Sequence, residues 1–497
     1  MKVDGVALIL AALPIIWLVV ALGVLRVRAH IAALVGFVIA FTGASVIPFL
    51  FSAFGDTESM RKVVSAAVSG VGFALSPICL IILAALFTYR ICKRSGALTV
   101  IRSRLVAVST DTRVITLLIG WGFGNFMEGI AGFGTSVAIP AAVMAGCGVD
   151  PLRSVVACLI ANSVSTAFGS VGVPAMALAK AADMSLLELS FDGFLEMSGG
   201  FIIAPFLVVA AVSGVRALKS VWWLCLAAGL SFVVPCLVVA RFVGPELPDV
   251  VGAIASLFTI AVLGRRVRAD ARYALKGAAA VSGGYPAGVV LRASCPFLLV
   301  VLLLGGYALL PASVKDRLPA GVVVFVAAVL GGFVQRMSPR QQLAALKAAF
   351  FKNAKTYLTI CLVLAMARVM DFSGAISVLA EALVAATGRA YVFFAPLVGA
   401  LGGFITGSGT SSNVIFGALQ AKAAAASALG VKPAVVVAAN MFGGGIGKML
   451  CPQSIAIGLA AVGLAGQEHV LLTKTIGWFF VILVLASVSC GLLALFL

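Results

Sequence analysis

The sequence predicts an all-α polytopic membrane protein with about 12 transmembrane helices plus two re-entrant hairpins in an inverted-topology repeat. Composition is the first reason. Of the 497 residues, 62% are hydrophobic and only 10% are charged, whereas soluble domains carry about 25% charged residues. The second reason is that apolar runs of membrane-spanning length recur along the whole chain. The third is an internal repeat. Residues 1–497 are therefore expected to form a single transmembrane domain.

The net charge of +18 indicates topology rather than nucleic-acid binding, because Lys and Arg gather in short segments between apolar runs. These basic segments are 26–28, 90–104, 265–276 and 335–355. The acidic or weakly charged segments are 54–59, 183–196, 244–249 and the loop near Lys315. The alternation predicts a multi-pass protein of the cytoplasmic membrane, surrounded by lipid, with basic loops in the cytoplasm and the N-terminus outside. No nucleic-acid partner is expected.

The first apolar segment lacks a basic n-region and a small-residue cleavage site, so we expect a retained span rather than a signal peptide. Simple spans are expected at 6–25, 31–53, 63–89, 197–215, 220–240, 250–264, 288–310, 318–335, 356–370 and 474–497. Two further regions, 112–180 and 390–466, are apolar but interrupted by glycine and polar residues. Each must cross the membrane once, in opposite directions. A re-entrant hairpin followed by a broken helix satisfies this in both regions.

These two regions share a pattern. Each has a Gly/Ser/Thr tract, then GV-x-P, then an asparagine that precedes a glycine by seven residues and a proline by twelve. The matching parts are 128–136, 148–151, Asn162, Gly169 and Pro174, and then 406–413, 430–433, Asn440, Gly447 and Pro452. The alternative is chance matching, since glycine is abundant. Opposite crossing directions predict an inverted repeat, which places binding sites near the midplane at broken helices.

Glu128 is the acid in WGFGNFMEGIAGFGTSVAIP, residues 121–140. An acid at membrane depth costs about 2.5–3.5 kcal/mol, so such a residue indicates a function. The surrounding glycines are typical of a hairpin tip, and a carboxyl in low dielectric can exchange a proton near neutral pH. Glu128 is therefore the proton-coupling candidate. The alternative is a structural acid that caps or pairs the hairpin.

Three other charged residues are candidates for a site. Lys448 ends a glycine tract that lacks the residues a P-loop requires, so nucleotide binding is rejected. It is instead a candidate partner of a substrate carboxylate or of Glu128, and the alternative is a lysine that snorkels to the interface. Arg368 and Asp371 lie three residues apart near a span end and are expected to form a local ion pair. A substrate role for Arg368 is the alternative.

Hydroxyl and amide side chains cluster at the proposed helix breaks. Such groups bind a carboxylate, a 2-hydroxyl or a cation, or they join helices. We interpret the set as substrate-binding candidates: Asn125, Gly132, Thr135, Ser136, Asn162, Ser163, Thr406, Ser408, Thr410, Ser411, Ser412, Asn413, Asn440, Lys448 and Gln453. His30 and His469 are placed in loops beside the membrane. Since no metal-ligand or nucleophile constellation appears, no metal, cofactor or enzymatic activity is expected.

The sequence resembles the lactate permease family of proton-coupled lactate and glycolate carriers. The stretches that carry the resemblance are 125–139, 158–174, 244–250, 393–420 and 438–464, and the most specific feature combines TGS-x-TSSN with GK-x-x-x-PQSIAI. The chain departs from the family pattern at Gly409, where the family has aspartate, and at Asp371, where it has asparagine. Ser136 and Ser165 stand where the family has prolines. Asp371 is therefore a second proton-coupling candidate.

The resemblance implies a secondary active transporter that imports a small 2-hydroxy-monocarboxylate with H⁺ by alternating access. On this hypothesis the substrate carboxylate binds half-helix N-termini and Lys448, the polar set binds the hydroxyl, and Glu128 takes the proton. The rival hypotheses are a Na⁺-coupled carrier of another carboxylate and an anion channel. Lactate against glycolate, stereospecificity, coupling stoichiometry and oligomeric state stay open.

Overall fold

The computed structural model describes residues 5–21, 25, 27–46, 60–132, 134–268, 270–275, 285–308, 310, 314, 318–426, 429–464 and 466–496. Within these ranges the chain is helical and forms no strand; one isolated β-bridge joins Asp111 and Ala274. Eight of the described helices are long and apolar enough to cross a membrane, and one bent pair adds a ninth. The predicted all-α membrane class is confirmed.

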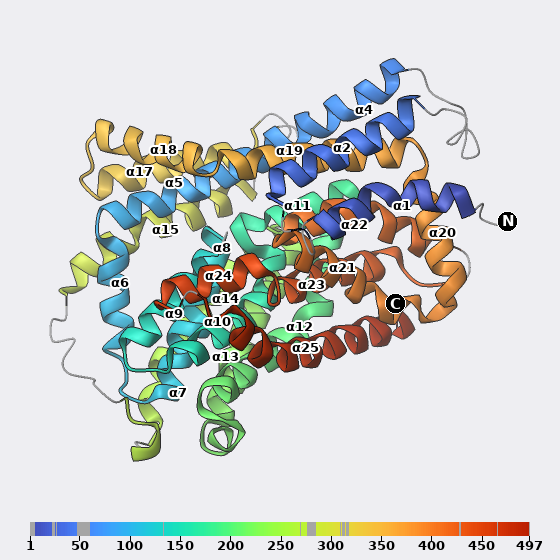
Figure 1. Ribbon diagram of the computed structural model, residues 1–497. Helices are drawn as coiled ribbons and strands as arrows, with labels where there is room; N and C mark the ends of the chain where they lie inside the picture. The colour runs from blue at the N-terminus through green and yellow to red at the C-terminus, as the bar shows by residue number, and fades with distance from the viewer. Residues whose placement is uncertain are drawn as a thin grey trace.

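The α-helices in chain order are α1 (Gly5–Val19), α2 (Ala29–Val46), α4 (Met60–Phe73), α5 (Leu80–Arg94), α6 (Ala97–Val106), α7 (Thr112–Ile115), α8 (Gly124–Ile130), α9 (Thr135–Gly146), α10 (Pro151–Ser165), α11 (Gly169–Ala181), α12 (Leu186–Ser213), α13 (Leu218–Phe242), α14 (Pro248–Leu263), α15 (Ala287–Ala308), α17 (Ala320–Val334), α18 (Pro339–Lys352), α19 (Ala354–Phe372), α20 (Ala375–Thr387), α21 (Tyr391–Thr406), α22 (Gly409–Ala425), α23 (Pro433–Lys448), α24 (Pro452–Ala461) and α25 (Glu468–Phe496). Figure 1 shows α2, α4, α5, α17, α18 and α19 along the top, and α12, α13 and α25 along the bottom. The interrupted helices of the two repeat-like regions lie between these layers.

In the first region, α7, a π-helical segment (Thr116–Phe123) and α8 lead to a turn, and α9 returns from it. Gly132 and Gly134 have φ of 56° and 81° in this turn, a conformation that favours glycine. The following helix is interrupted between α10 and α11, where Ser170 and Val171 also have positive φ. A β-branched residue in this conformation is strained, and such strain clusters at functional sites.

The second region repeats the arrangement. α21 ends at Gly407, which has φ of 66°, and α22 starts at Gly409. The next helix is interrupted between α23 and α24, which meet at an angle of 47°. Because Pro452 lacks an N–H, it is suited to the first turn of α24 and not to a continuous helix.

Equivalent residues make equivalent contacts in the two regions. Asn162 on α10 donates to Ser136 on α9, and Asn440 on α23 donates to Asn413 on α22, each at 3.0 Å. A Cβ on Gly169 would lie 2.8 Å from Oε1 of Glu128 on α8, and a Cβ on Gly447 would collide with a backbone oxygen of α21. Each broken helix therefore packs closely on both helices of its own hairpin-like pair.

The span predicted at 63–89 is present as a membrane-capable stretch, Arg61–Arg94, but it is not one unbroken helix. α4 and α5 are separated by a π-helical turn, Ala74–Cys79, in which Ser76 has φ of −137° and ψ of 120°. The cause is local, because the residue before a proline avoids the helical region and Pro77 follows Ser76. Part of the span predicted at 31–53 lies outside the described residues, since α2 ends at Val46.

Four stretches interpreted as loops are helical. The acidic segment 183–196 contains the start of α12, the basic segment 335–355 contains α18, the basic segment 90–104 belongs to α5 and α6, and His30 lies in the first turn of α2. In α12 the acids Glu188 and Asp192 lie four residues apart on one face, and Lys432 pairs with both at 3.3 and 2.6 Å. The charged residues of 183–196 were therefore interpreted as part of a loop, although they lie on one face of a helix. α20 was also missing from the predicted spans.

Candidate functional site

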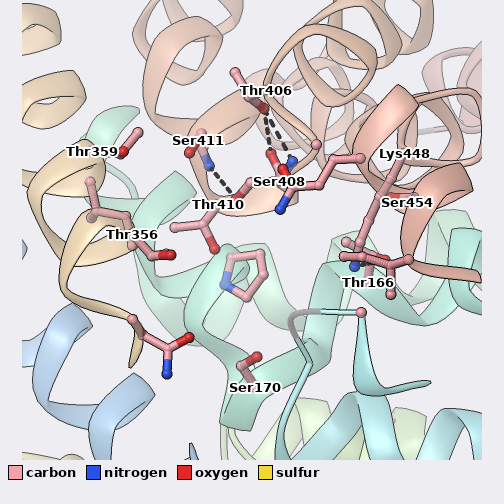
Figure 2. A pocket seen from close by; sticks show the side chains of 18 of the residues that line it. Thr166, Ser170, Thr356, Thr359, Thr406, Ser408, Thr410, Ser411, Lys448 and Ser454 are labelled. Carbon is pink, nitrogen blue, oxygen red and sulfur yellow. Dashed lines mark hydrogen bonds between the residues drawn. The ribbon is translucent and has the colours of Figure 1, made fainter. Parts of the chain in front are cut away.

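A cavity of about 230 Å³ lies where the interrupted helices of the two regions approach each other. Its lining comes from the α21–α22 turn, the ends of α8, α23 and α24, the break before α11, and the starts of α2 and α19. Figure 2 shows Thr166, Ser170 and Lys448 on one side and Thr356 and Thr359 on the other. Most of the labelled groups are hydroxyls, so the site is polar although the chain is apolar.

Glu128 and Lys448 form an ion pair at this cavity. The Lys448 Nζ lies 3.1 Å from Glu128 Oε1, and the side chains are 8% and 3% exposed. The bond joins residues far apart in sequence, one on α8 and one at the end of α23. The last turn of a helix favours a cation, which suits Lys448. The two charged residues found inside the apolar regions of the sequence are thus each other's partner.

Neutral hydroxyl groups hold both charges. Ser136 donates to Glu128 Oε2 at 2.5 Å and accepts from Asn162 at 3.0 Å. Lys448 Nζ also donates to Thr166 Oγ1 at 3.3 Å, and Thr166 donates to the Asn162 carbonyl at 2.7 Å. Hydrogen bonds to charged groups are the stronger kind, so these contacts fix both groups at the cavity wall.

The turn between α21 and α22 supplies one wall of the cavity. Ser408 caps α22 by accepting from the Ser411 N–H at 3.2 Å, and the Ser408 N–H donates to Thr406 Oγ1 at 3.2 Å. The N-termini of α22 and α24 reach the cavity with Thr410 and Gln453, and Gly134 does so before α9. Helix N-termini carry partial positive charge, so the wall is suited to an anion.

The opposite wall was not predicted from the sequence. It consists of His30 from α2 and of Asn353, Lys355, Thr356 and Thr359 around the start of α19. From the sequence, Asn353 and Lys355 were assigned to the basic segment 335–355, Thr356 and Thr359 to the span at 356–370, and His30 to a loop. No motif connects them to the Gly/Ser/Thr tracts; tertiary packing alone brings them to the cavity. Thr166 and Ser170, in the first helix break, were also missed.

Several predicted site residues make bonds inside the helix packing instead. Asn413 donates to the Pro174 carbonyl at 2.9 Å, and Asn440 accepts from Gln420 at 3.2 Å. Three further predicted residues donate their hydroxyl groups to backbone oxygens: Thr135 to Gly132, Ser163 to Ile160 and Ser412 to Gly399. Asn125 is fully buried, and neither atom of its amide has a partner among the described residues. These residues do not line the cavity.

The predicted ion pair between Arg368 and Asp371 is wrong. Asp371 pairs with Lys422 at 2.7 Å, and the two side chains are 33% and 34% exposed. Arg368 donates instead to the Lys180 carbonyl at 3.4 Å. Both residues line a separate small cavity with Lys180, away from Glu128. A long arginine side chain reaches past the neighbouring turn to a helix end, where a carbonyl accepts its hydrogen bond.

Two glycines fix how closely the regions approach. A side chain on Gly132 would collide with the Ser170 hydroxyl, and a Cβ on Gly409 would lie 2.7 Å from Thr166 Cγ2. An aspartate at 409, as in the resembled family, would therefore crowd the threonine that Lys448 contacts. Ser136, where that family has proline, supplies the hydroxyl bonded to Glu128.

Comparison with protein families gives a match over nearly the whole chain. The family model described as L-lactate permease matches residues 7–318 and 314–497. An L-lactate permease of Streptococcus iniae is 36% identical over 84% of this chain and 90% of its own length. An L-lactate permease of Escherichia coli strain K12 is 34% identical over 94% and 92%, and a glycolate permease of that strain is 31% identical over 95% and 93%.

Two solved structures share the fold. The YdaH transporter of Alcanivorax borkumensis superposes with a TM-score of 0.54 at 18% identity, over 93% of this chain and 98% of that one. MtrF of Neisseria gonorrhoeae gives 0.55 at 13% identity, over 93% and 95%. At these identities the likeness concerns the fold alone.

Proposed function

This chain belongs to the L-lactate permease family, whose members are transporters and not enzymes, and we propose that it imports a small 2-hydroxy-monocarboxylate together with protons. The relatives named above are an L-lactate permease from each of two bacteria and a glycolate permease. Lactate and glycolate are both small 2-hydroxy-monocarboxylates, so we assign that substrate class to this chain.

The observation that carries the proposal is the ion pair between Glu128 and Lys448 at the cavity. An incoming carboxylate competes with Glu128 for the Lys448 ammonium group. When the substrate takes Lys448, Glu128 is left buried without its cation, and an isolated buried carboxylate is strongly disfavoured. Glu128 then binds a proton, so substrate binding and proton binding are coupled through one lysine.

The polar walls of the cavity recognise the rest of the substrate. The N-termini of α22 and α24 add partial positive charge beside Lys448 for the carboxylate. The 2-hydroxyl donates to and accepts from neighbouring hydroxyls, for which Thr166, Ser170 and Thr410 are the candidates. A site that hydrogen-bonds a substrate hydroxyl rejects analogues without it, because its own polar groups stay unpaired.

We propose an architecture of about 12 spans with two re-entrant hairpins in an inverted repeat, in the cytoplasmic membrane, with the N-terminus outside. α8–α9 and α21–α22 are the hairpins. Rocking of one region against the other gives alternating access. The substitutions Arg272→Cys and Arg389→Cys test the orientation, because both positions are exposed and the proposed topology puts the first inside and the second outside. In intact cells an impermeant thiol reagent is expected to label only Cys at 389, with the wild-type chain as background; labelling of only 272 would invert the topology.

Transport by the purified wild-type protein in proteoliposomes tests the function. A gradient of H⁺ alone is expected to drive radiolabelled L-lactate or glycolate above its outside concentration, and collapse of the gradient is expected to release it. Accumulation that follows only a Na⁺ gradient at fixed pH would show that Na⁺, and not the proton, is the coupling ion. Flux that never exceeds equilibrium under either gradient would favour the anion channel.

A further inference from the structure

Asp249 is a second buried acid, and it lies against the helix that carries Glu128. It lies in the first turn of α14 and is 1% exposed, and neither carboxylate oxygen has a hydrogen-bond partner among the described residues. An ionised carboxylate without donors is strongly disfavoured in such a place. The helix N-terminus favours a negative charge, but this effect is weaker than the cost of burying an unpaired ion. The surroundings of Asp249 therefore favour its protonated form.

Asp249 lies against α8, directly beside the residue that follows Glu128. A Cβ on Gly129 would lie 3.2 Å from Asp249 Oδ2, so no side chain separates α8 from this carboxyl. The charge of Glu128 acts on Asp249 from α8. From α13, Cys236 is the titratable neighbour, and its Sγ donates to the Pro248 carbonyl at 2.8 Å. Two carboxyls that share a buried site do not both ionise readily.

The break between α10 and α11 packs against Glu128 and against the loop that precedes Asp249. A Cβ on Gly169 would lie 2.8 Å from Glu128 Oε1. Gly172 packs so closely on the Pro245 carbonyl, in the loop before α14, that a Cβ would collide with it. Any movement of this break therefore changes the surroundings of Glu128 and the position of the segment that carries Asp249.

We propose that Asp249 is a second proton-binding residue, which holds a proton in the resting state and releases it during the transport cycle. This inference rests on the proton coupling proposed above. While Glu128 is negative and paired with Lys448, its charge keeps Asp249 protonated. After the substrate takes Lys448 and Glu128 is protonated, that repulsion ends. The O–H bond of Asp249 then breaks, the proton passes to water on the side to which the site opens, and a carboxylate remains.

The substitution Asp249→Asn tests this role, because the amide imitates the protonated acid but cannot release a proton. Proteoliposomes with Asp249→Asn are expected to exchange lactate at the wild-type rate in the absence of a gradient. Their accumulation under an H⁺ gradient is expected to fall below the wild-type inside-to-outside ratio, because only the proton bound by Glu128 then remains coupled to transport. Glu196→Gln is the matched control, because Glu196 is also 1% exposed with both oxygens unpartnered in the described part of the chain, but it lies on α12 and its acidic neighbour is Asp192. The control is expected to accumulate lactate normally.

The outcomes separate this inference from the proposed function. Normal accumulation by Asp249→Asn overturns the inference and leaves the carrier assignment intact. Failure of the wild-type protein to accumulate lactate overturns the proposed function itself. If Asp249→Asn has lost exchange as well, Asp249→Glu decides: accumulation by this variant supports the inference, and its absence overturns it.

Discussion

The two interrupted regions, 112–181 and 391–461, offer the same scaffold with opposite chemistry. In each, a broken helix starts at a proline, and its asparagine bonds the second helix of the hairpin-like pair. The first region supplies the anionic side chain, Glu128 on α8, and the second supplies the cationic side chain, Lys448 at the end of α23. The scaffold thus sets the positions, and the residues that differ between the regions set the charge.

The two regions also differ in how their helices are broken. The first break has consecutive residues with positive φ, including Ser170 and Val171, and it contributes Thr166 and Ser170 to the cavity. The second is a bend of 47° that ends at Pro452. A strained backbone persists only where its surroundings hold it. The first break is therefore held in a strained conformation by its surroundings, and in the proposal above the first region carries the proton-binding Glu128 and the second carries Lys448, which binds the substrate carboxylate.

Substitution of Lys448 is expected to have the largest effect on uptake and stability. Lys448→Gln leaves Glu128 buried without its cation, and breaking a buried pair costs about 3–5 kcal/mol. Uptake is expected to fall by about 100-fold or more, together with the melting temperature of the purified protein. The double variant Glu128→Gln with Lys448→Gln is expected to regain the melting temperature but not the uptake. Equal melting temperatures of the single and double variants would contradict the pairing.

Substitution of the equivalent glycines is expected to separate stability from coupling. Gly447→Ala places a methyl group against the Ala400 carbonyl, which belongs to a rigid helix, and overpacking of this kind costs about 1–3 kcal/mol. Gly169→Ala instead meets the Glu128 carboxylate, the end of a side chain that can move. The melting temperature is expected to fall more in Gly447→Ala, and the pH dependence of uptake is expected to change more in Gly169→Ala. The reverse order would contradict the assignment of roles to the two regions.

The smallest effect is expected at Asp371. Its partner Lys422 and its own side chain are about one-third exposed, and pairs of this kind contribute about 0–1 kcal/mol. Asp371→Asn and Lys422→Ala are therefore expected to leave stability and proton-driven uptake almost unchanged. Loss of accumulation in Asp371→Asn alone would move the proton site from the first region to this residue.

The sequence predicted the charged centre because an acid or a lysine inside an apolar run is costly and therefore conspicuous. Glu128 and Lys448 both belong to that class, and their pairing was one of the alternatives considered. The repeat spacing also matched Asn162 with Asn440, and these two residues make equivalent bonds, although both were expected to bind substrate.

The remaining parts of the site depend on tertiary packing. His30 and Thr356 reach the cavity only because α19 packs against α22 and α2 packs against α19, which no local pattern encodes. Asp249 was assigned to a loop because it ends the acidic segment 244–249, although it lies in the first turn of a helix and is buried. Hydroxyl and amide clusters are also ambiguous, because helix packing and ligand binding use the same side chains. Asn413 bonds a backbone carbonyl within the helix packing, whereas Thr410 lines the cavity.

The most direct test of the central claim compares wild type with Glu128→Gln in proteoliposomes under an imposed H⁺ gradient. We predict that wild type accumulates radiolabelled L-lactate, whereas Glu128→Gln only equilibrates it and still exchanges it, because the amide cannot bind the coupling proton. Asp371→Asn is the control and is expected to behave as wild type. Accumulation by Glu128→Gln equal to that of wild type would contradict the account, since the proton would then bind elsewhere.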